Sequence, residues 1–403
     1  MKGVSGYKMK NKAVAYTFIV LLICCAALFL MPADKDSFKS ENRTQSQIPA
    51  LTNENVFSGE FAEDFERYVN DSIAFRSKFT AASHFLESNK GITPPDGRVV
   101  YTDKDIGTET VKKACLLIAD GKIMEVFAEN PTAEKIYADA INKVASGIDE
   151  NIDVYSMLVP TQLEFAENVY KNIQNSQMKT IDRIYSMLLP RIKGIDVYSA
   201  LKEHKDEYIY FRSDHHWTML GSYYGYNAFM KAKGSATVSK DNFEKKRVEG
   251  FLGYLYEQYP DRSVKENPDV IEWYDVSKVL NPEMKMHSIR EDGTEHDYTA
   301  PMFDETKNNY DLFMSSDHPY VEITNNQLLS GETLLIIRDS YASVFVPWCV
   351  NNYNRIIMID PRTYKENLRD VFNKYKIDDV LFLNYIFTTS FEDYCDKMIG
   401  IFN

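Results

Sequence analysis

The sequence predicts an α/β fold with a mostly parallel sheet that is covered by helices on both faces. Three near-continuous apolar runs, at 334–337, 355–359 and 380–386, lie among segments with helical periodicity. Strands of a parallel sheet are buried on both faces, so they read as unbroken apolar runs. A fourth run at 154–159 lies between two predicted helices, so the β–α alternation begins near residue 130.

The N-terminal segment 13–32 is apolar and uncharged, and its 20 residues can span a hydrocarbon core of ~30 Å. Four lysines precede this segment, at positions 2, 8, 10 and 12. The positive-inside rule then predicts a cytoplasmic tail at 1–12, a transmembrane signal anchor at 13–32 and an extracytoplasmic body. A cleaved signal peptide is the alternative, but no small residue lies three positions before Ala33. A lipoprotein signal is disfavoured because Ile23 precedes Cys24.

Residues 33–55 are polar and predict a linker, and residues 56–403 form the globular body. The net charge of −13 argues against nucleic acids and anionic membrane surfaces as partners. The body has three cysteines and no CxxC motif, so the sequence indicates neither a disulfide framework nor a zinc knuckle. Three separate buried thiols are favoured over a bridge between Cys349 and Cys395.

The first half of the body predicts these elements in chain order. Residues 58–89 have helical character, and Asp120-Gly121 suits the turn of a β-hairpin. A helix is expected from Asn130-Pro131 to Gly147, followed by the strand at 154–159. Further predicted elements are a helix at 178–192, a short strand at 195–200, and a strand before a helix that begins at Thr218.

The second half contains the three apolar runs and helical stretches at 363–376 and 390–401. Before them, residues 238–330 form a long polar stretch with many Tyr, Asp and Pro residues. We interpret this stretch as an insertion with short strands and loops. It could form a lid or a wall of the substrate site, or it could simply cover the edge of the sheet.

The segment Arg212–Trp217 carries the first group of chemically suited residues. Asp214 and His216 are two positions apart, so the carboxylate can hold the imidazole in one tautomer while the other ring nitrogen acts as a base. A metal site is an alternative for the adjacent histidines, although HExxH, HxH and nearby cysteines are missing. A buried structural histidine pair is the other alternative. The sequence predicts no cofactor.

Ser340 comes directly after the apolar run at 334–337 and the pair Arg338-Asp339. In a parallel α/β sheet a nucleophile occupies this position, where backbone N–H groups can help to bind an oxyanion. The GxSxG motif is absent because Arg338 and Ala342 replace its glycines. A turn serine without catalytic function is the alternative at this position.

The string DHHW at 214–217, followed by IRDSYAS at 337–343, resembles the DHHW protein family. That family is similar to the alginate O-acetylation proteins AlgJ and AlgX, which have an SGNH-hydrolase-like fold with permuted catalytic segments. The resemblance covers most of the body from about residue 56. It implies Asp214 as the orienting acid, His216 as the base and Ser340 as the nucleophile.

Several further residues are candidates for oxyanion or substrate contacts at the implied site. Asn384, at the end of the last apolar run, could donate to an oxyanion or cap the strand. Arg362 could bind an anionic sugar or form a structural ion pair. Trp217 is expected to pack beneath the site. The remaining candidates are Arg338, Tyr341 and His215.

The resemblance implies O-acetylation or deacetylation of a cell-envelope or secreted polysaccharide. We expect a serine-dependent O-acetyltransferase that receives acetyl groups from a membrane-bound O-acyltransferase. An acetylesterase with the same residues is one alternative. A glycan-binding scaffold without catalytic activity is the other, since a fold does not establish an activity.

Overall fold

The computed structural model describes residues 16, 48–52, 61–62, 65, 68–69, 97–101, 115–166, 170, 173–280, 282–289, 294–328 and 331–402. The chain divides into two compact units, Met1–Ile92 and Thr93–Asn403. The boundaries predicted after residues 12, 32 and 55 lie outside the described residues, as does nearly all of the predicted signal anchor. Among the described residues, no helix is both long and apolar enough to cross a membrane. Within the helix predicted at 58–89, the described residues are helical.

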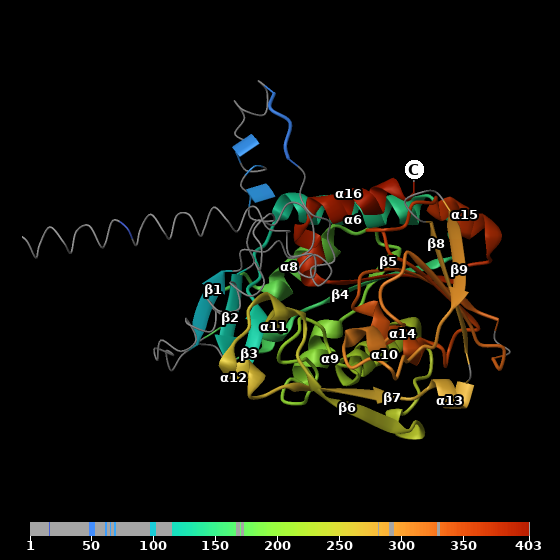
Figure 1. The fold of residues 1–403 in the computed structure, drawn as a ribbon. Coiled ribbons are helices and arrows are strands. Elements are labelled where there is room, and N and C mark those ends of the chain that lie inside the picture. The colour runs from blue at the N-terminus through green and yellow to red at the C-terminus, as the bar shows by residue number, and fades with distance from the viewer. Residues whose placement is uncertain are drawn as a thin grey trace, which may run out of the picture. The chain divides into compact units, whose positions relative to one another are not determined.

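An eight-stranded sheet forms the centre of the second unit, in the order β5-β4-β13-β11-β12-β10-β8-β9 (Figure 1). The strands are β4 (Asp153–Val159), β5 (Ile192–Gly194), β8 (Glu283–Ile289), β9 (Glu295–Thr299), β10 (Tyr320–Thr324), β11 (Thr333–Arg338), β12 (Arg355–Ile359) and β13 (Asp379–Tyr385). All pairings from β5 to β12 are parallel. The apolar runs thus form adjacent parallel strands, as predicted.

The other part of this sheet differs from the prediction. Strand β10 pairs with β12, β8 pairs with β10, and β9 pairs with β8, and all three pairings are antiparallel. The sheet is therefore mixed, and the segment 238–330 supplies three of its strands. The sequence predicts short strands and loops in this segment but does not place them in the central sheet, because β8 to β10 are more polar than the central runs. In β8 and β10, buried residues alternate with more exposed ones, which is typical of antiparallel strands.

Helices cover the parallel part of the sheet on both faces (Figure 1). One face carries α6 (Pro131–Ser146), α8 (Gln177–Met187), α15 (Leu368–Lys374) and α16 (Glu392–Gly400). The other carries α9 (Val197–Glu203), α10 (Met219–Lys233) and α14 (Ala342–Cys349). Side chains of β11 alternate between the two cores: Leu335 and Ile337 face the first group of helices, and Leu334 and Ile336 face the second.

Local sequence signals explain where the well-predicted helices begin and end. Asn130 accepts a hydrogen bond from the backbone of Ala133, and Pro131 occupies the first turn of α6, which ends before Gly147. Thr218 caps α10 in the same way through the N–H of Gly221. Both helix starts were predicted from these residues.

Four predicted elements need correction. The strand predicted at 195–200 is wrong, because Asp196 accepts a hydrogen bond from the N–H of Ser199 and begins α9 instead. The helix predicted at 178–192 ends at Met187, ahead of Pro190. The helix predicted at 363–376 is limited to α15. The strand expected before Thr218 is reduced to a single bridge between Tyr210 and Trp217.

Two smaller sheets complete the second unit. The first contains β1 (Arg98–Tyr101), β2 (Cys115–Ala119) and β3 (Lys122–Glu125), and the turn between β2 and β3 is the predicted Asp120-Gly121 hairpin. The second pairs β6 (Lys245–Phe251) with β7 (Asp269–Tyr274), and the short helices α11 (Tyr254–Gln258), α12 (Arg262–Lys265) and α13 (Ser277–Leu280) lie in the same part of the chain.

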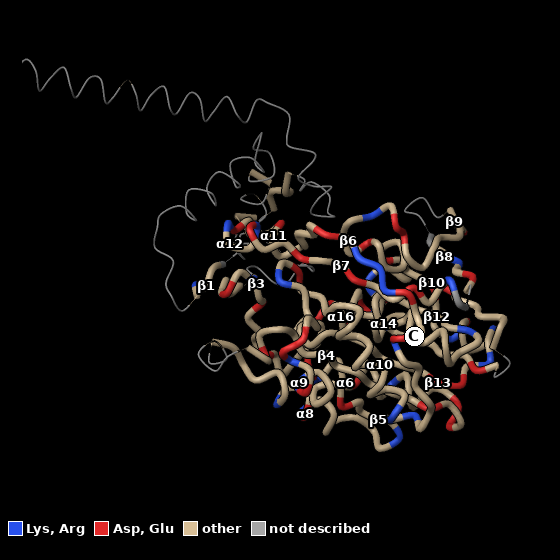
Figure 2. The backbone as a smooth tube through the Cα atoms, turned by 90° about the horizontal axis from the view of Figure 1, so that it is seen from below, with Lys and Arg blue, Asp and Glu red and all other residues tan. Residues whose placement is uncertain are grey.

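Cysteine and charge placement can be compared directly with the prediction. Among the described residues, Cys115, Cys349 and Cys395 form no disulfide, so the optional bridge between Cys349 and Cys395 is not formed; Cys115 is only partly buried. Figure 2 shows that the basic residues on β6 have acidic neighbours. Lys245 pairs with Glu272 of β7, and Lys246 pairs with Asp275, the residue that follows β7. Nearby carboxylates therefore largely neutralise these two lysines.

Candidate active site

Asp214, His216 and Ser340 form one continuous chain of hydrogen bonds, although 124 residues separate His216 from Ser340. The Nδ1 atom of His216 lies 2.6 Å from Oδ1 of Asp214, and its Nε2 atom lies 2.7 Å from Oγ of Ser340. An ionised carboxylate only accepts hydrogen bonds, so Nδ1 carries the hydrogen. Nε2 is then free to accept the hydrogen of the Ser340 hydroxyl.

The charge of Asp214 is maintained inside the protein. Burial alone would raise the pKa of this carboxyl, but the neighbouring His216 and His215 rings and the hydrogen bonds from His216 hold that pKa well below its usual range. The backbone N–H groups of His216 and Tyr254 also donate to the carboxylate, at 2.9 and 2.8 Å. Asp214 is therefore an anion that fixes the orientation of His216.

Asp269, at the start of β7, positions the loop that carries Asp214. Its carboxylate accepts hydrogen bonds from the backbone N–H groups of Arg212 and Ser213, both at 2.8 Å. The hydroxyl of Ser213 accepts the N–H of Gly253 at 2.9 Å. A Cβ atom at Gly253 would lie 2.3 Å from Cβ of Asp214, so only glycine fits against this carboxylate. Sequence reasoning missed both Asp269 and Gly253.

Ser340 follows the carboxyl end of β11, the edge of a parallel sheet at which active sites form. Asp339 shapes this turn: its carboxylate accepts hydrogen bonds from the N–H of Tyr341 at 3.0 Å, the N–H of Tyr385 at 2.9 Å and the hydroxyl of Thr388 at 2.8 Å. Burial raises the pKa of Asp339. The residue before Ser340 is thus held by the ends of two neighbouring strands.

Tyr310 is a further residue of the site that the sequence did not reveal. Its ring lies parallel to the His216 ring, with centroids 3.7 Å apart and 7° between the planes. Its hydroxyl donates to the carbonyl of Ser340 at 2.9 Å. Tyr310 belongs to the segment 238–330, so this segment contributes a wall of the site, which was one of the two alternatives considered for it.

Arg338 and Arg362 are held in a network of ion pairs. Arg338 is buried and pairs with Asp317, and its Nη1 atom lies 3.7 Å from Asp360. Arg362 bridges Asp317 and Asp360 at 2.8 and 2.6 Å. These contacts correspond to the structural alternative considered for Arg362. They also explain the arginine at 338, which anchors the end of β11 to the loop before β10.

Asn384 is fully buried and its side chain is bonded on every side. Its amide nitrogen donates to Asp339 at 3.3 Å and to Tyr394 at 2.6 Å, and its oxygen accepts the hydroxyl of Tyr137 at 2.8 Å. Both amide hydrogens are therefore in use. This geometry favours a structural role of Asn384 at the strand end over a role as oxyanion donor, because both of its amide hydrogens already form hydrogen bonds.

Trp217, Tyr341 and His215 surround the hydrogen-bonded chain. Trp217 is buried, and its indole N–H donates to the carbonyl of Tyr341 at 2.9 Å, which fits the expected packing beneath the site. The hydroxyl of Tyr341 donates to the carbonyl of His215. The rings of His215 and His216 have centroids 3.9 Å apart. Burial, with the adjacent His216, lowers the pKa of His215, so its ring is neutral near pH 7.

The metal alternative can be examined at the same residues. Ligand atoms of Asp214, His215 and His216 lie within 4.8 Å of one another. Both ring nitrogens of His216 already have partners in Asp214 and Ser340, and a metal ion would have to replace one of them. The donor set therefore fits serine chemistry without rearrangement and fits a metal only after the chain of hydrogen bonds is broken.

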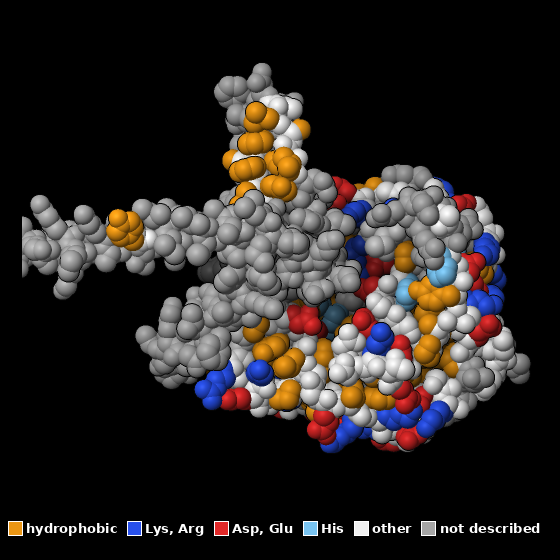
Figure 3. All heavy atoms as spheres, in the orientation of Figure 1, with side chains coloured by type: hydrophobic (Ala, Val, Ile, Leu, Met, Phe, Trp, Pro, Cys, Tyr) orange, Lys and Arg blue, Asp and Glu red, His pale blue; other side chains and the backbone are white. Residues whose placement is uncertain are grey.

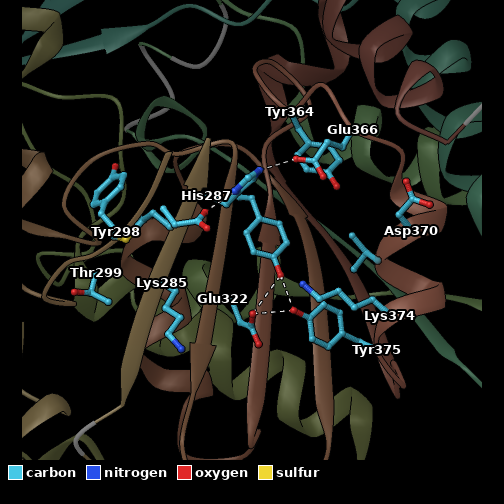
Figure 4. A pocket seen from close by; sticks show the side chains of 14 residues that line it. Lys285, His287, Tyr298, Thr299, Glu322, Tyr364, Glu366, Asp370, Lys374 and Tyr375 are labelled. Atoms are coloured by element: carbon cyan, nitrogen blue, oxygen red, sulfur yellow. Dashed lines mark hydrogen bonds and ion pairs between the residues drawn. The ribbon is translucent and has the colours of Figure 1, made fainter. Parts of the chain in front are cut away.

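A separate pocket of about 500 Å³ lies over β8, β10 and α15 (Figure 4). Its centre is occupied by paired groups: His287 lies between Asp297 and Glu366, at 2.6 and 3.0 Å, and Tyr375 donates to Glu322 at 2.8 Å. Figure 3 shows hydrophobic, acidic, basic and histidine side chains intermingled on one face of the described chain. None of Asp214, His216 and Ser340 lines the pocket, so it is separate from their chain of hydrogen bonds.

The family model described as DHHW protein matches residues 101–359 of this chain. No curated protein matches the chain.

Solved structures show the fold. A DHHW family protein from Eubacterium siraeum has a TM-score of 0.63 and 24% identity, covering 74% of this chain and 99% of its own. PatB1 from Bacillus cereus has a TM-score of 0.60 and 18% identity, covering 70% of this chain and 99% of its own. PatB1 with a sulfonyl adduct has a TM-score of 0.59 and 17% identity, with coverages of 74% and 98%. The structures of AlgJ from Pseudomonas putida and AlgX from Pseudomonas aeruginosa also match, but their TM-scores of 0.39 and 0.35 carry no argument.

Proposed function

Since this chain belongs to the DHHW protein family, we propose that it is an O-acetyltransferase that modifies a cell-envelope or secreted polysaccharide. The observation that carries the proposal is the unbroken chain of hydrogen bonds from Asp214 through His216 to Ser340. A serine hydroxyl is a weak nucleophile until a positioned base takes its proton. His216 is within reach of that proton, and Asp214 stabilises the positive charge that the ring then acquires.

The reaction proceeds in two steps. Oγ of Ser340 attacks the carbonyl carbon of the acetyl donor, its proton passes to Nε2 of His216, and the donor's leaving group departs with that proton. A sugar hydroxyl then attacks the acetyl-serine carbonyl and gives its proton to His216. The bond from the carbonyl carbon to Ser340 breaks, and His216 returns the proton to the serine.

The oxyanion that forms in both steps needs hydrogen-bond donors. Within the described chain, the backbone N–H of Ser340 donates no hydrogen bond, whereas the N–H of Tyr341 is bound to Asp339. We assign the first oxyanion contact to the Ser340 N–H. The side chain of Asn384 supplies no second contact, because both of its amide hydrogens are already donated to Asp339 and Tyr394.

The location and partners of the enzyme follow from the same proposal. The apolar segment 13–32, with four lysines before it, supports an N-terminal membrane anchor and an extracytoplasmic body. The acetyl donor would reach Ser340 from a membrane-bound O-acyltransferase. The acceptor would be a polysaccharide outside the cytoplasm.

The full chain, purified in a mild detergent, should hydrolyse a chromogenic acetyl ester, and neutral oligosaccharides should divert the acetyl group to acetylated sugar. Ser340→Ala should abolish both products. Hydrolysis without any acetylated sugar would support an acetylesterase instead. If the wild-type protein gives neither product, it is not an acyl-transfer enzyme, and the glycan-binding scaffold gains support.

A further inference from the structure

Two buried polar atoms near the loop of Asp214 and His216 have no hydrogen-bond partner among the described residues. They are Oε2 of Glu125, on β3, and Nδ1 of His215. A buried polar atom that makes no hydrogen bond destabilises the fold, so such atoms are uncommon and call for an explanation. Neither atom has a role in the chain of hydrogen bonds formed by Asp214, His216 and Ser340.

Both atoms belong to the same part of the site. The N–H of Ile123, on β3, donates to the carbonyl of Arg212 at 2.8 Å, which ties the strand of Glu125 to the loop of His215. The charge of Glu125 acts on both His215 and Asp214. Asp214 does not satisfy His215, because its Oδ1 atom lies 3.8 Å from Nδ1 of that ring, beyond hydrogen-bonding distance.

The surroundings of this pair suit a polar ligand with apolar faces. The ring of His215 lies 5.6 Å from that of Tyr254 and 5.8 Å from that of Tyr385, measured between centroids. The side chain of His215 is 16% exposed, so part of its ring reaches the accessible side of the site, whereas Glu125 is buried. Aromatic faces with a few convergent hydrogen-bonding groups are typical of small-molecule sites.

We propose that Glu125 and His215 form an acceptor subsite, which binds a hydroxyl group of the carbohydrate that takes the acyl group from Ser340. A hydroxyl offers one donor and two acceptor positions. It can donate to the carboxyl oxygen of Glu125 and accept from Nδ1–H of His215, and so satisfies both unpaired atoms at once. This inference rests on the proposed function, and it names the residues that direct the acyl group to a sugar instead of water.

In the transfer step, the bound sugar presents a neighbouring hydroxyl to the acetyl-serine carbonyl. That hydroxyl loses its proton to Nε2 of His216 as its oxygen bonds to the carbonyl carbon. The bond to Oγ of Ser340 then breaks, and Nε2 returns the proton to Oγ. Glu125 and His215 neither gain nor lose a proton. They hold the acceptor in place, which raises its effective concentration relative to water.

The test is the partition of one acyl-enzyme between two products. Full-length wild type, Glu125→Met, Glu125→Gln and His215→Phe would be acylated with a chromogenic acetyl ester in the presence of glycerol or a panel of neutral oligosaccharides. Released acetate and acetylated acceptor would be measured together. Glu129→Gln is the matched control, because Glu129 lies on the same chain segment and binds Arg183 at the surface.

Each product is counted per acyl-enzyme formed, so that a change in the acylation rate does not enter the comparison. We expect the ratio of transfer to hydrolysis to fall at least tenfold in Glu125→Met and His215→Phe. Glu125→Gln keeps an acceptor oxygen and should fall less. An unchanged ratio in both Glu125→Met and His215→Phe would overturn the acceptor subsite while leaving the proposed function intact. Acylation of the wild type with no transfer to any hydroxyl would also overturn it.

A binding readout separates this inference from the proposed function. Saturation-transfer NMR of the same oligosaccharides with Ser340→Ala protein needs no turnover. Binding that is lost in the Ser340→Ala, Glu125→Met double variant supports the subsite even if the wild type is not acylated, a result that would contradict only the proposed function. Equal binding by the single and double variants would contradict the subsite.

Discussion

The ring of Tyr310 lies parallel to that of His216, 3.7 Å away between centroids, while its hydroxyl donates to the carbonyl of Ser340. One side chain thus contacts both the proposed base and the residue proposed as nucleophile. It comes from a 3₁₀ turn, Tyr310–Leu312, in a segment far from either motif. This contact links the segment 238–330 to the chemistry.

Variants of Tyr310 should separate its two contacts. Tyr310→Phe keeps the stacked ring and loses a hydrogen bond of about 1 kcal/mol, so Ser340 should react with a serine-directed probe roughly fivefold more slowly. Tyr310→Ala also loses the surface that holds the His216 ring, and we expect a loss of ~100-fold. Stopped-flow labelling rates would show this order. Equal rates for both variants and the wild type would argue against any role of Tyr310.

Gly253→Ala should disturb the site without replacing a proposed catalytic residue. The added Cβ would lie 2.5 Å from Oδ2 of Asp214, so the carboxylate or the loop must move. Because a displacement of about 1 Å can cost ~100-fold in rate, esterase activity should fall by more than ~10-fold. Gly400→Ala is the control, because a Cβ there meets nothing within 4 Å. Similar activities of the two variants would contradict the close approach.

Arg338→Met should destabilise the fold. Arg338 is buried, and its removal leaves the carboxylates of Asp317 and Asp360 with one positive partner fewer. Breaking a buried ion pair on one side costs roughly 3–5 kcal/mol. Urea unfolding would measure the change. Arg355→Met, at a partly exposed pair with Glu322, should cost less than ~1 kcal/mol. A loss no larger than that control would mean that the buried network contributes little.

The pH dependence of stability should carry the signature of Glu125. Burial raises its pKa from 4.5 to about 7 in the folded protein. Below pH 4.5 the carboxyl is protonated in both states, whereas between pH 4.5 and 7 only the unfolded state releases the proton. The wild type should therefore lose roughly 1–3 kcal/mol of stability across this interval, relative to Glu125→Gln. A constant difference in unfolding free energy from pH 4.5 to 8 would contradict the raised pKa.

Chelation tests the metal alternative at Asp214, His215 and His216. Serine chemistry requires no ion there, so dialysis against EDTA should leave the labelling rate of Ser340 unchanged within twofold. Metal analysis of the protein before and after dialysis provides the control. Loss of labelling that returns on addition of a divalent cation would show that the cluster binds a functional metal.

The sequence predicted those parts of the fold that local signals determine. Apolar runs identify the central parallel strands, and Asn130 and Thr218 mark helix starts, because each signal acts within a few residues. The strand predicted at 195–200 was wrong because two local signals compete there. Its apolar residues suit a strand, but the cap formed by Asp196 begins a helix.

The candidate site was predicted only where a motif stands in the sequence. Asp214, His216 and Ser340 were found through the DHHW string and the serine after a strand, and the structure brings all three together. Tyr310 and Glu125 lie in segments without a motif, and their positions depend on tertiary packing. The bonds of Asn384 to three distant residues are likewise invisible in one sequence.

The central claim is that Ser340 is a nucleophile activated by His216. The full chain would be incubated with a sulfonyl fluoride, a reagent class that also suits the sulfonyl adduct seen in PatB1, and its intact mass measured. We predict one adduct on the wild type, none on Ser340→Ala, and labelling slowed by ~100-fold or more in His216→Ala. No adduct on the wild type, or an adduct that persists in Ser340→Ala, would contradict the account.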